Sequence, residues 1–372
     1  MSKSPQSGAN PGDGGLHTRR EFLRTSFLGA AMSWSVPLFL ERTFGALHAE
    51  ASDSSLQITT GRDAPILVVV QLAGGNDGLN TVVPFADDIY HRERPKLALA
   101  ADSVHRLDDY SGLHPELRGL AALYDDGLLG VIHGVGYPNP NRSHFRSTEI
   151  WQTAVDADET ARHGWIGRYF DNYCRGEGAL AGVAVGGKPP QAFAAESPAG
   201  VRFASPDELR WVGGGDGGDD LDGLFRELNS PAEATSGSSI SALGGSAAPT
   251  TGSAMEFLER TALDAQVSSE TVIEVARRNR VSTEFPNSAL ARDLELVARL
   301  IAGGLSTRVY YVSQGGYDTH VNQQGAHERL LGELDGAVTA FCREMRRQDN
   351  HQRVTLMTFS EFGRRLAENG SA

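Results

Sequence analysis

Short apolar segments that end in glycine-rich or polar turns constrain the fold of this chain more than any other feature. Four segments rich in β-branched residues have this character: residues 65–71, 128–133, 307–313 and 353–359. Such segments are typical of parallel strands that are covered on both faces. Helical patterns over residues 289–302 and 324–347 precede and follow the third segment. Strand, helix and strand at this spacing form a βαβ unit, so the sequence predicts an α/β fold with a mostly parallel sheet.

The N-terminus is predicted to be an export signal. Arg19 and Arg20 precede Phe22 and Leu23, and a mostly apolar, uncharged run follows over residues 25–40. This run is short and weak for a membrane span. Paired arginines before such a run are typical of the twin-arginine signal, which a receptor reads. The alternative is an amphipathic N-terminal helix.

A cleavage site of the A-x-A type fits residues 49–51, which divides the chain into a signal over residues 1–51 and a domain over residues 52–372. We expect the twin-arginine translocase to be a partner during export. The mature chain should then be periplasmic or secreted, with no stable membrane span after cleavage.

Charge and composition restrict the partners. The net charge of −13 makes nucleic acid and anionic lipid poor partners, so no nucleic acid is expected. An anionic substrate stays open if a metal ion supplies local positive charge. Residues 212–254 are rich in Gly, Ser and Asp and are predicted to form a flexible insertion, for which a calcium loop is the weaker interpretation. Cys174 and Cys342 are expected to be free thiols, with a disulfide as the alternative.

Chemically useful side chains follow the predicted strands. Because the carboxyl ends of parallel strands open on one edge of a sheet, these side chains should converge there. The convergent set comprises Asp77, Ser143, His144, Asp318, His320 and Glu361. Each carboxylate taken alone is as well explained as a turn or capping residue, so the prediction of a site depends on their coincidence.

The gathered carboxylates would repel one another unless a cation lay among them, and a divalent metal is the simplest such cation. Asp318 and His320 are two positions apart, so both can point at one ion from extended backbone. Nitrogen and oxygen ligands together favour zinc, manganese or iron over calcium, and zinc or manganese is the cofactor that we expect. The metal ligands predicted in this way are Asp77, Asp318, His320 and Glu361.

The segment before the helical pattern at residue 144 supplies catalytic candidates. Ser143 is either the N-cap of that helix or a nucleophile that the helix dipole and a metal would activate. His144 adjoins it, and Arg142 or Arg146 could hold an anionic leaving group. Surface salt bridges are the commoner role of such arginines.

Five ordered motifs carry a family resemblance: QLAGGNDGLNTVVP, HGVGYPNPNRSHFRSTEIWQT, GWIGRY, GGYDTHVNQ and TFSEFGRRLAENGS. Together they resemble the domain of unknown function (DUF) family 1501, exported bacterial proteins related to the alkaline phosphatase and sulfatase superfamily. The resemblance implies an alkaline-phosphatase-like α/β/α sandwich and up to two metals. It also implies that Asp77 is a first-strand ligand, that Ser143 is the nucleophile, and that Asp318, His320 and Glu361 are further ligands.

Two departures from the superfamily pattern accompany the resemblance. The usual Asp-x-x-x-His is here Asp318-Thr319-His320, and Glu361 has no adjacent histidine. The family normally continues beyond residue 371 into a Thr-Asp-His-Gly segment and another strand, so the chain is expected to be truncated at its C-terminus.

Three functions are compatible with these observations. The first is a metal-dependent hydrolase of phosphate or sulfate esters, with an anionic small molecule or a glycan as substrate. The second is a non-catalytic exported protein that binds a glycan or a protein partner on the same fold. The third and weakest is a dinucleotide oxidoreductase, suggested by Gly74-Gly75-x-x-Gly78 after a strand. Pro84 leaves too little room for the helix that such a motif requires.

Overall fold

A computed structural model describes most of the chain between residues 64 and 369. The described ranges are residues 64–174, 179–186, 190–196, 200–203, 271–320 and 322–369. All of them belong to one compact unit, Ser52–Ala372. The predicted signal at residues 1–51 and the predicted insertion at residues 212–254 lie outside the described residues.

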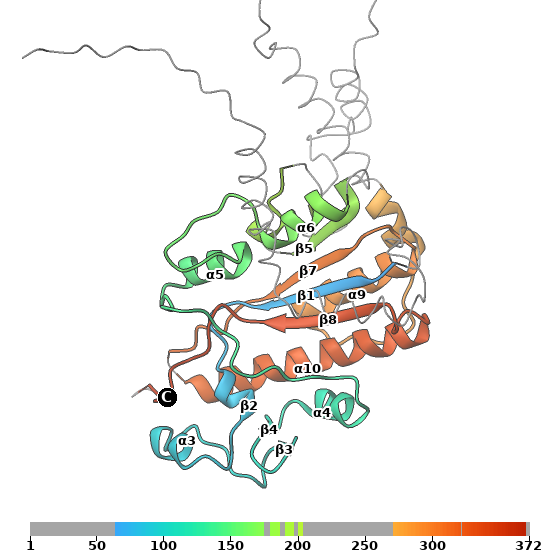
Figure 1. Ribbon diagram of the computed structural model, residues 1–372. Helices are drawn as coiled ribbons and strands as arrows, with labels where there is room; N and C mark the ends of the chain where they lie inside the picture. The colour runs from blue at the N-terminus through green and yellow to red at the C-terminus, as the bar shows by residue number, and fades with distance from the viewer. Residues whose placement is uncertain are drawn as a thin grey trace, which may run out of the picture. The chain divides into compact units, whose positions relative to one another are not determined.

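A parallel sheet forms the centre of the described unit, with the strand order β6-β5-β7-β1-β8 (Figure 1). Its strands are β1 (Ile66–Leu72), β5 (Gly182–Val185), β6 (Gly200–Phe203), β7 (Val309–Gln314) and β8 (Val354–Phe359). In the register of the sheet, Val68 of β1 lies beside Tyr310 of β7 and Leu356 of β8. The predicted α/β class is therefore confirmed, and so are three of the four predicted strands.

Burial across the sheet follows the sequence pattern. Every residue of β1 is buried, as expected for a central strand without alternation, whereas β8 at the edge is mostly half-buried. Helix α9 (Ala289–Ala302) begins at Ser288, whose side chain accepts a hydrogen bond from Ala291 N–H. Helix α10 (Gln323–Arg347) packs against α9, and its apolar stripe enters the same core. Both helices were predicted within a residue of their observed starts.

A smaller antiparallel sheet with the order β2-β4-β3 follows β1 in the chain. Its strands are β2 (Val82–Val83), β3 (His105–Arg106) and β4 (Gly112–Leu113). Helix α3 (Asp88–Glu93) lies between β2 and β3 in the chain, and helix α4 (Arg118–Asp125) follows β4. The carboxylate of Asp335 on α10 accepts hydrogen bonds from Gly119 N–H and Leu120 N–H, in the first turn of α4. This contact caps α4 and holds it against α10.

The predicted strand at residues 128–133 is not a strand in the structure. Leu128 and Ile132 are 55% and 67% exposed, and the segment runs without regular structure from α4 toward α5 (His144–Thr153). A short apolar run indicates a strand only if a neighbouring strand completes the ladder of hydrogen bonds. No such ladder is made here, although the edge of β8 is open on this side among the described strands.

Helix α6 (Trp165–Tyr173) follows α5, and short 3-10 turns at residues 179–181 and 191–193 flank β5. Cys174 and Cys342 are not in a disulfide in the described structure, in agreement with the prediction of thiols. Within the described ranges, no helix has both the length and the apolar character needed to cross a bilayer.

Candidate functional site

The carboxyl ends of β1, β7 and β8 meet at one rim of the sheet, and their turns interlock. Ala73 N–H donates to Gln314 O, and Tyr317 N–H donates to Ala73 O, so the turn after β1 is bonded to the turn after β7. Gly74 adopts φ +117°, and a Cβ at this position would lie 2.5 Å from Asp318 N. A glycine is thus required where the two turns approach each other.

A chain of hydrogen bonds and ion pairs joins four predicted site residues at this rim. His144 Nδ1 lies 2.8 Å from Glu361 Oε1, and His144 Nε2 lies 3.3 Å from Asp318 Oδ1. His320 Nε2 lies 2.7 Å from the same Asp318 oxygen. The rim therefore gathers His144, Asp318, His320 and Glu361, which come from three widely separated parts of the chain.

Glu361 is the buried member of this group, at 2% exposure. Its Oε1 accepts a hydrogen bond from Gly74 N–H at 2.8 Å as well as the bond from His144. The His144 ring also packs on the ring of Phe362, with centroids 4.7 Å apart. These contacts fix the orientation of the imidazole and direct Nε2 toward Asp318.

Helix α5 brings His144 to the rim, and Gln152 near its end fixes the helix to the sheet. Gln152 Nε2 lies 3.2 Å from both Gln71 Oε1 and Tyr311 Oη, and Gln152 Oε1 accepts from Gln191 N–H. Buried amide groups with satisfied bonds specify one arrangement of the elements that they join. The position of His144 is therefore set by the sheet itself.

Both ring nitrogens of His144 face carboxylate oxygens. Because an ionised carboxylate only accepts hydrogen bonds, the ring can donate to Glu361 and Asp318 together only as the imidazolium. A cation bound at Nε2 would replace that proton, and the bond from Nδ1–H to Glu361 would remain. In metal sites, a carboxylate often accepts the second ring N–H of a ligating imidazole, as Glu361 does here, and this bond raises the basicity of the imidazole.

Asp318 is surrounded by positive or basic groups. Its Oδ1 contacts His144 and His320, and Arg364 Nη2 lies 3.2 Å from the same atom. Asp318 and His320 are exposed side chains, whereas Arg364 is mostly buried and also donates to Tyr317 O. The charge of Asp318 is therefore balanced by its protein neighbours.

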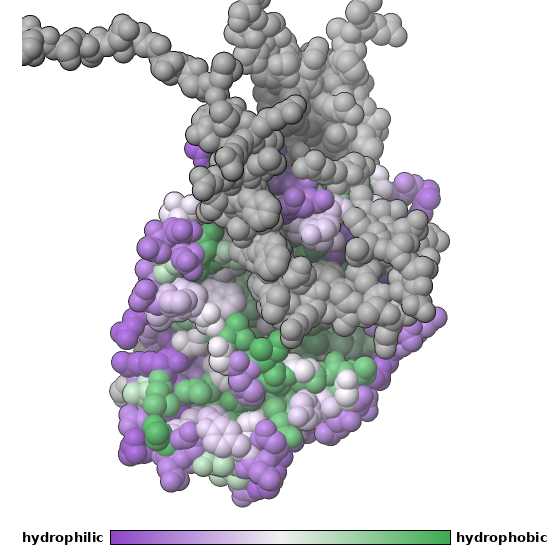
Figure 2. All heavy atoms as spheres, in the orientation of Figure 1, coloured by the Kyte–Doolittle hydropathy of each residue, from purple (hydrophilic) through white to green (hydrophobic). Residues whose placement is uncertain are grey.

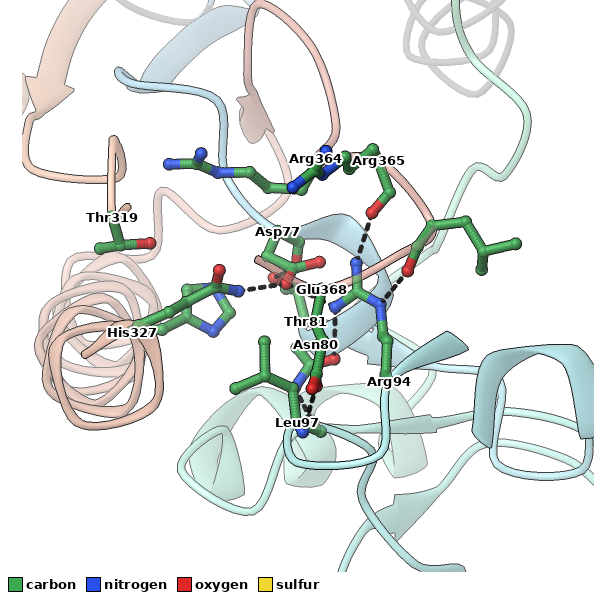
Figure 3. A network of polar contacts seen from close by, with 12 residues as sticks. Asp77, Asn80, Thr81, Arg94, Leu97, Thr319, His327, Arg364, Arg365 and Glu368 are labelled. Atoms are coloured by element: carbon green, nitrogen blue, oxygen red, sulfur yellow. Dashed lines mark hydrogen bonds and ion pairs between the residues drawn. The ribbon is translucent and has the colours of Figure 1, made fainter. Parts of the chain in front are cut away.

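Asp77 has a different counterion from the residues of this group. Its Oδ2 lies 2.6 Å from Arg94 Nη1, and both side chains are almost completely buried, at 2% and 1% exposure (Figure 3). Gln323 Nε2 donates to the same oxygen, whereas Asp77 Oδ1 has no hydrogen-bond partner in the described part of the chain. Arg94 also donates to Asn80 Oδ1 and to the carbonyl groups of Arg365 and Leu366.

Sequence reasoning did not identify Arg94. This residue is the C-cap of the short helix α3, where no motif or periodicity distinguishes it from a surface arginine. Arg94 follows Asp77 closely in the sequence, between β1 and α5. Closeness in sequence alone does not predict an ion pair.

Two buried histidines lie next to the Asp77 network. His327 Nε2 is 2.9 Å from Asn76 Oδ1, and its ring centroid is 6.0 Å from that of His114. Burial lowers the pKa of His327 to about 4 and also lowers the pKa of His114. Both rings are therefore neutral near pH 7, and His327 donates its Nε2–H to the amide oxygen of Asn76.

Ser143 is exposed and occupies the N-cap position of α5, but its side chain makes no capping hydrogen bond. Its N–H donates instead to Asn141 Oδ1. The interpretation of the Ser143 hydroxyl as a helix cap is therefore wrong. Arg142 is exposed beside it, whereas Arg146 pairs with Glu149 and donates to the carbonyl groups of Ala157 and Glu159.

The rim fits a divalent ion in part. In the described ranges, no three His, Cys, Asp or Glu side chains stand in ready ligand geometry. His144 and His320 each approach Asp318 Oδ1 within 3.3 Å, which is about the spacing of two neighbouring ligands on one tetrahedral zinc ion. His320 is 65% exposed and Asp318 is 47% exposed, so both donors are accessible to an ion from solvent.

The fold and the rim define an α/β protein with a histidine–carboxylate cluster at the carboxyl edge of a parallel sheet. Residues 228–372 match the family described as "Protein of unknown function (DUF1501)". This match supports the family resemblance of the C-terminal motifs. No curated protein and no solved structure matches the chain.

Proposed function

We propose that this protein is a metal-dependent hydrolase of phosphate or sulfate esters that works at the rim of the sheet. One observation carries the proposal: His144 is held between buried Glu361 and exposed Asp318, and His320 contacts the same Asp318 oxygen. This arrangement pairs a buried orienting carboxylate with exposed nitrogen and oxygen donors, as metal sites in proteins do.

The proposed ligands are His144 Nε2, the Asp318 carboxylate and His320 Nε2. Glu361 then acts behind His144 as a positioning residue, because its oxygen is already bonded to Nδ1 and to Gly74 N–H. Asp77 is left without a metal in this proposal, because Arg94 neutralises it. Two imidazoles with one carboxylate favour zinc, with manganese as the second choice.

The chemistry of the site follows from the side chains around the cluster. A bound divalent ion would supply Lewis acidity and lower the pKa of a coordinated hydroxyl or water. Ser143 offers an exposed hydroxyl that is free of a capping bond and adjoins His144. Arg142 and the N-terminus of α5 provide positive potential for an anionic ester group at the same place. We therefore propose Ser143 as the nucleophile and Arg142 as the group that holds the anionic ester. His144, next to Ser143, holds the metal ion.

The proposal extends to the fold family and the compartment. The parallel sheet with helices and the rim position of the cluster support an alkaline-phosphatase-like α/β/α sandwich. The paired arginines at residues 19–20 support export, with the mature protein in the periplasm or outside the cell.

Turnover of aryl phosphates and aryl sulfates by the full chain, with and without added Zn²⁺ or Mn²⁺, tests this function. We expect metal-dependent hydrolysis that Ser143→Ala reduces by at least about 10²-fold, since the nucleophile is lost. Ser103→Ala removes another exposed serine and should leave the rate unchanged. Hydrolysis that does not respond to metal, or that Ser143→Ala leaves intact, would contradict the proposal.

A second candidate is a non-catalytic exported protein that binds a glycan or a protein partner at the rim. The observation that favours it is charge balance: Asp77, Asp318 and Glu361 all have basic or N–H partners from the protein itself. A stable protein that retains a carbohydrate ligand and turns over no ester in the same assay would favour this function.

A further inference from the structure

The outer edge of β8 is an open edge of the sheet. Among the described strands, β8 pairs with β1 alone, and its side chains are mostly half-buried although they read VTLMTF. Open edges of this kind present unpaired N–H and C=O groups and accept a further strand. The question is which segment fits this edge.

The register identifies the backbone groups that are available. Ile66 N–H donates to Arg353 O, and in a parallel ladder the bonded partner groups alternate along the strand. Odd-numbered residues such as Thr355 and Met357 therefore direct their N–H groups toward β1. Leu356 and Thr358 direct theirs toward the open edge.

Residues 128–133, with the sequence LLGVIH, are suited to this edge by composition. Leu128 and Ile132 are exposed large hydrophobic side chains, and a Cβ at Gly130 would have no atom within 4 Å. Figure 2 shows a band of hydrophobic residues on the face where Figure 1 draws the segment between α4 and α5. Residues 128–133 are thus an exposed apolar segment without strand hydrogen bonds, and β8 has an edge that could accept such a segment.

The two ends of the segment are fixed at the two ends of β8. Before it, Asp126 pairs with Arg346 near the end of α10, which leads into the start of β8. After it, His144 bonds to Glu361, just beyond the end of β8. The segment therefore runs in the same direction as β8. Residues 127–143 have ample length, since a six-residue strand spans about 20 Å.

The handedness of the connections also fits. The connection β7–α10–β8 passes over β1, and a connection from β1 through α4 to residues 128–133 would pass over β8 in the same direction. Because α4 packs on α10, both crossovers would use the same side of the sheet and would have the same hand. Crossovers between parallel strands are almost always right-handed, so two crossovers in one sheet are expected to share one hand.

We propose that residues 128–133 add to the open edge of β8 as a sixth parallel strand, in a second conformation of the chain. The added strand places Leu128 and Ile132 together on one face of the sheet and satisfies the outward amides of β8. It also shortens the free length that leads to Ser143 and His144, so closure of the strand restrains the approach to the rim. This inference concerns the backbone and does not depend on the proposed hydrolase activity.

Amide hydrogen exchange at single-residue resolution tests the proposal in the full-length protein. Leu356 and Thr358 report on the added strand, and Thr355 and Met357 are internal controls that β1 protects in either case. We expect the two reporters to exchange at least about tenfold more slowly than unstructured amides of the same sequence, because the added strand protects them whenever it forms. Reporters that exchange at the unstructured rate would overturn the proposal.

Proline variants assign the occupant of the edge. Val131→Pro and Ile132→Pro together cover both alternating sets of N–H groups, so one of them must remove a ladder bond. We expect that variant to abolish protection of Leu356 and Thr358 and to leave Thr355 and Met357 protected. Ile132→Ala keeps its N–H and should preserve protection of the reporters. Protection that survives both proline variants would assign the edge to another segment, and protection that rises with protein concentration would assign it to a second copy. Either result would overturn the proposal.

Discussion

At the scale of single residues, the structure changes the electrostatic basis of the site. Carboxylates at a common rim need a counter-charge, and the sequence suggested a metal for all of them. Asp77 instead receives a guanidinium, from Arg94, in a pair that is almost fully buried. Among the three carboxylates, Asp318 keeps the features expected of a metal ligand, with half-buried His144 and exposed His320 on one oxygen.

Removing Arg94 should destabilise the protein strongly, because it leaves the carboxylate of Asp77 buried without a counterion. We expect Arg94→Ala to lower the free energy of unfolding by roughly 3–5 kcal/mol. Arg92→Ala is the matched control, since Arg92 forms an exposed pair with Glu93 and should change it by at most about 1 kcal/mol. Urea denaturation measures both; similar values for the two variants would refute the buried ion pair.

The buried His327 makes stability depend on pH. Its pKa is about 4 in the folded protein and 6.5 in the unfolded chain, so the unfolded chain binds the proton more readily. The stability that neutral His327 contributes is fully present above pH 6.5 and is lost as the pH falls toward 4. The loss is at most about 3 kcal/mol, since one unit of pKa difference corresponds to about 1.4 kcal/mol. His327→Gln should flatten the difference in unfolding free energy between pH 7 and pH 4.5. An unchanged pH profile in this variant would show that His327 does not carry the effect.

At the scale of elements, the turn after β1 connects the sheet to the rim. Gly74 holds a positive φ, and its N–H binds Glu361 while its Cα faces the backbone of Asp318. One residue thus connects three strand ends, which explains why glycine is required at this position.

Substitution of glycines in this turn should have unequal effects. Gly74→Ala places a Cβ 2.5 Å from Asp318 N at φ +117°, so we expect it to lower the free energy of unfolding by more than about 1 kcal/mol. Gly78→Ala meets no atom within 4 Å and should stay within about 0.5 kcal/mol of the wild type. Thermal unfolding compares them. Equal effects at the two positions would argue against the close approach of the turns.

The element pattern was predictable where burial and periodicity agree. The buried run at β1 and the apolar stripe of α10 gave both elements, and the strand-end rule placed Asp318, His320 and Glu361 at one rim. His144 reaches the same rim from α5, although the strand predicted before it is not formed. The segment at residues 128–133 shows the limit, because a strand depends on a partner that local composition does not encode. Arg94 shows another, because long side chains find counterions through tertiary contacts alone.

At the scale of the whole molecule, the described part combines a rigid sheet with an exposed, chemically varied rim. The sheet fixes α5 through Gln152 and the orientation of His144 through Glu361, and Asp318 and His320 remain accessible to solvent. A rigid support behind accessible donors suits a site that takes up an ion and an anionic substrate.

Zinc titration of metal-stripped protein by calorimetry tests this account most directly. We expect one ion to bind per chain, with binding lost in Asp318→Asn and in His320→Gln, whose exposed positions should leave the fold intact. Glu361→Gln should weaken binding by roughly 10–100-fold through the orientation of His144. A protein that binds no zinc, or that binds it equally well in Asp318→Asn and His320→Gln, would contradict the account.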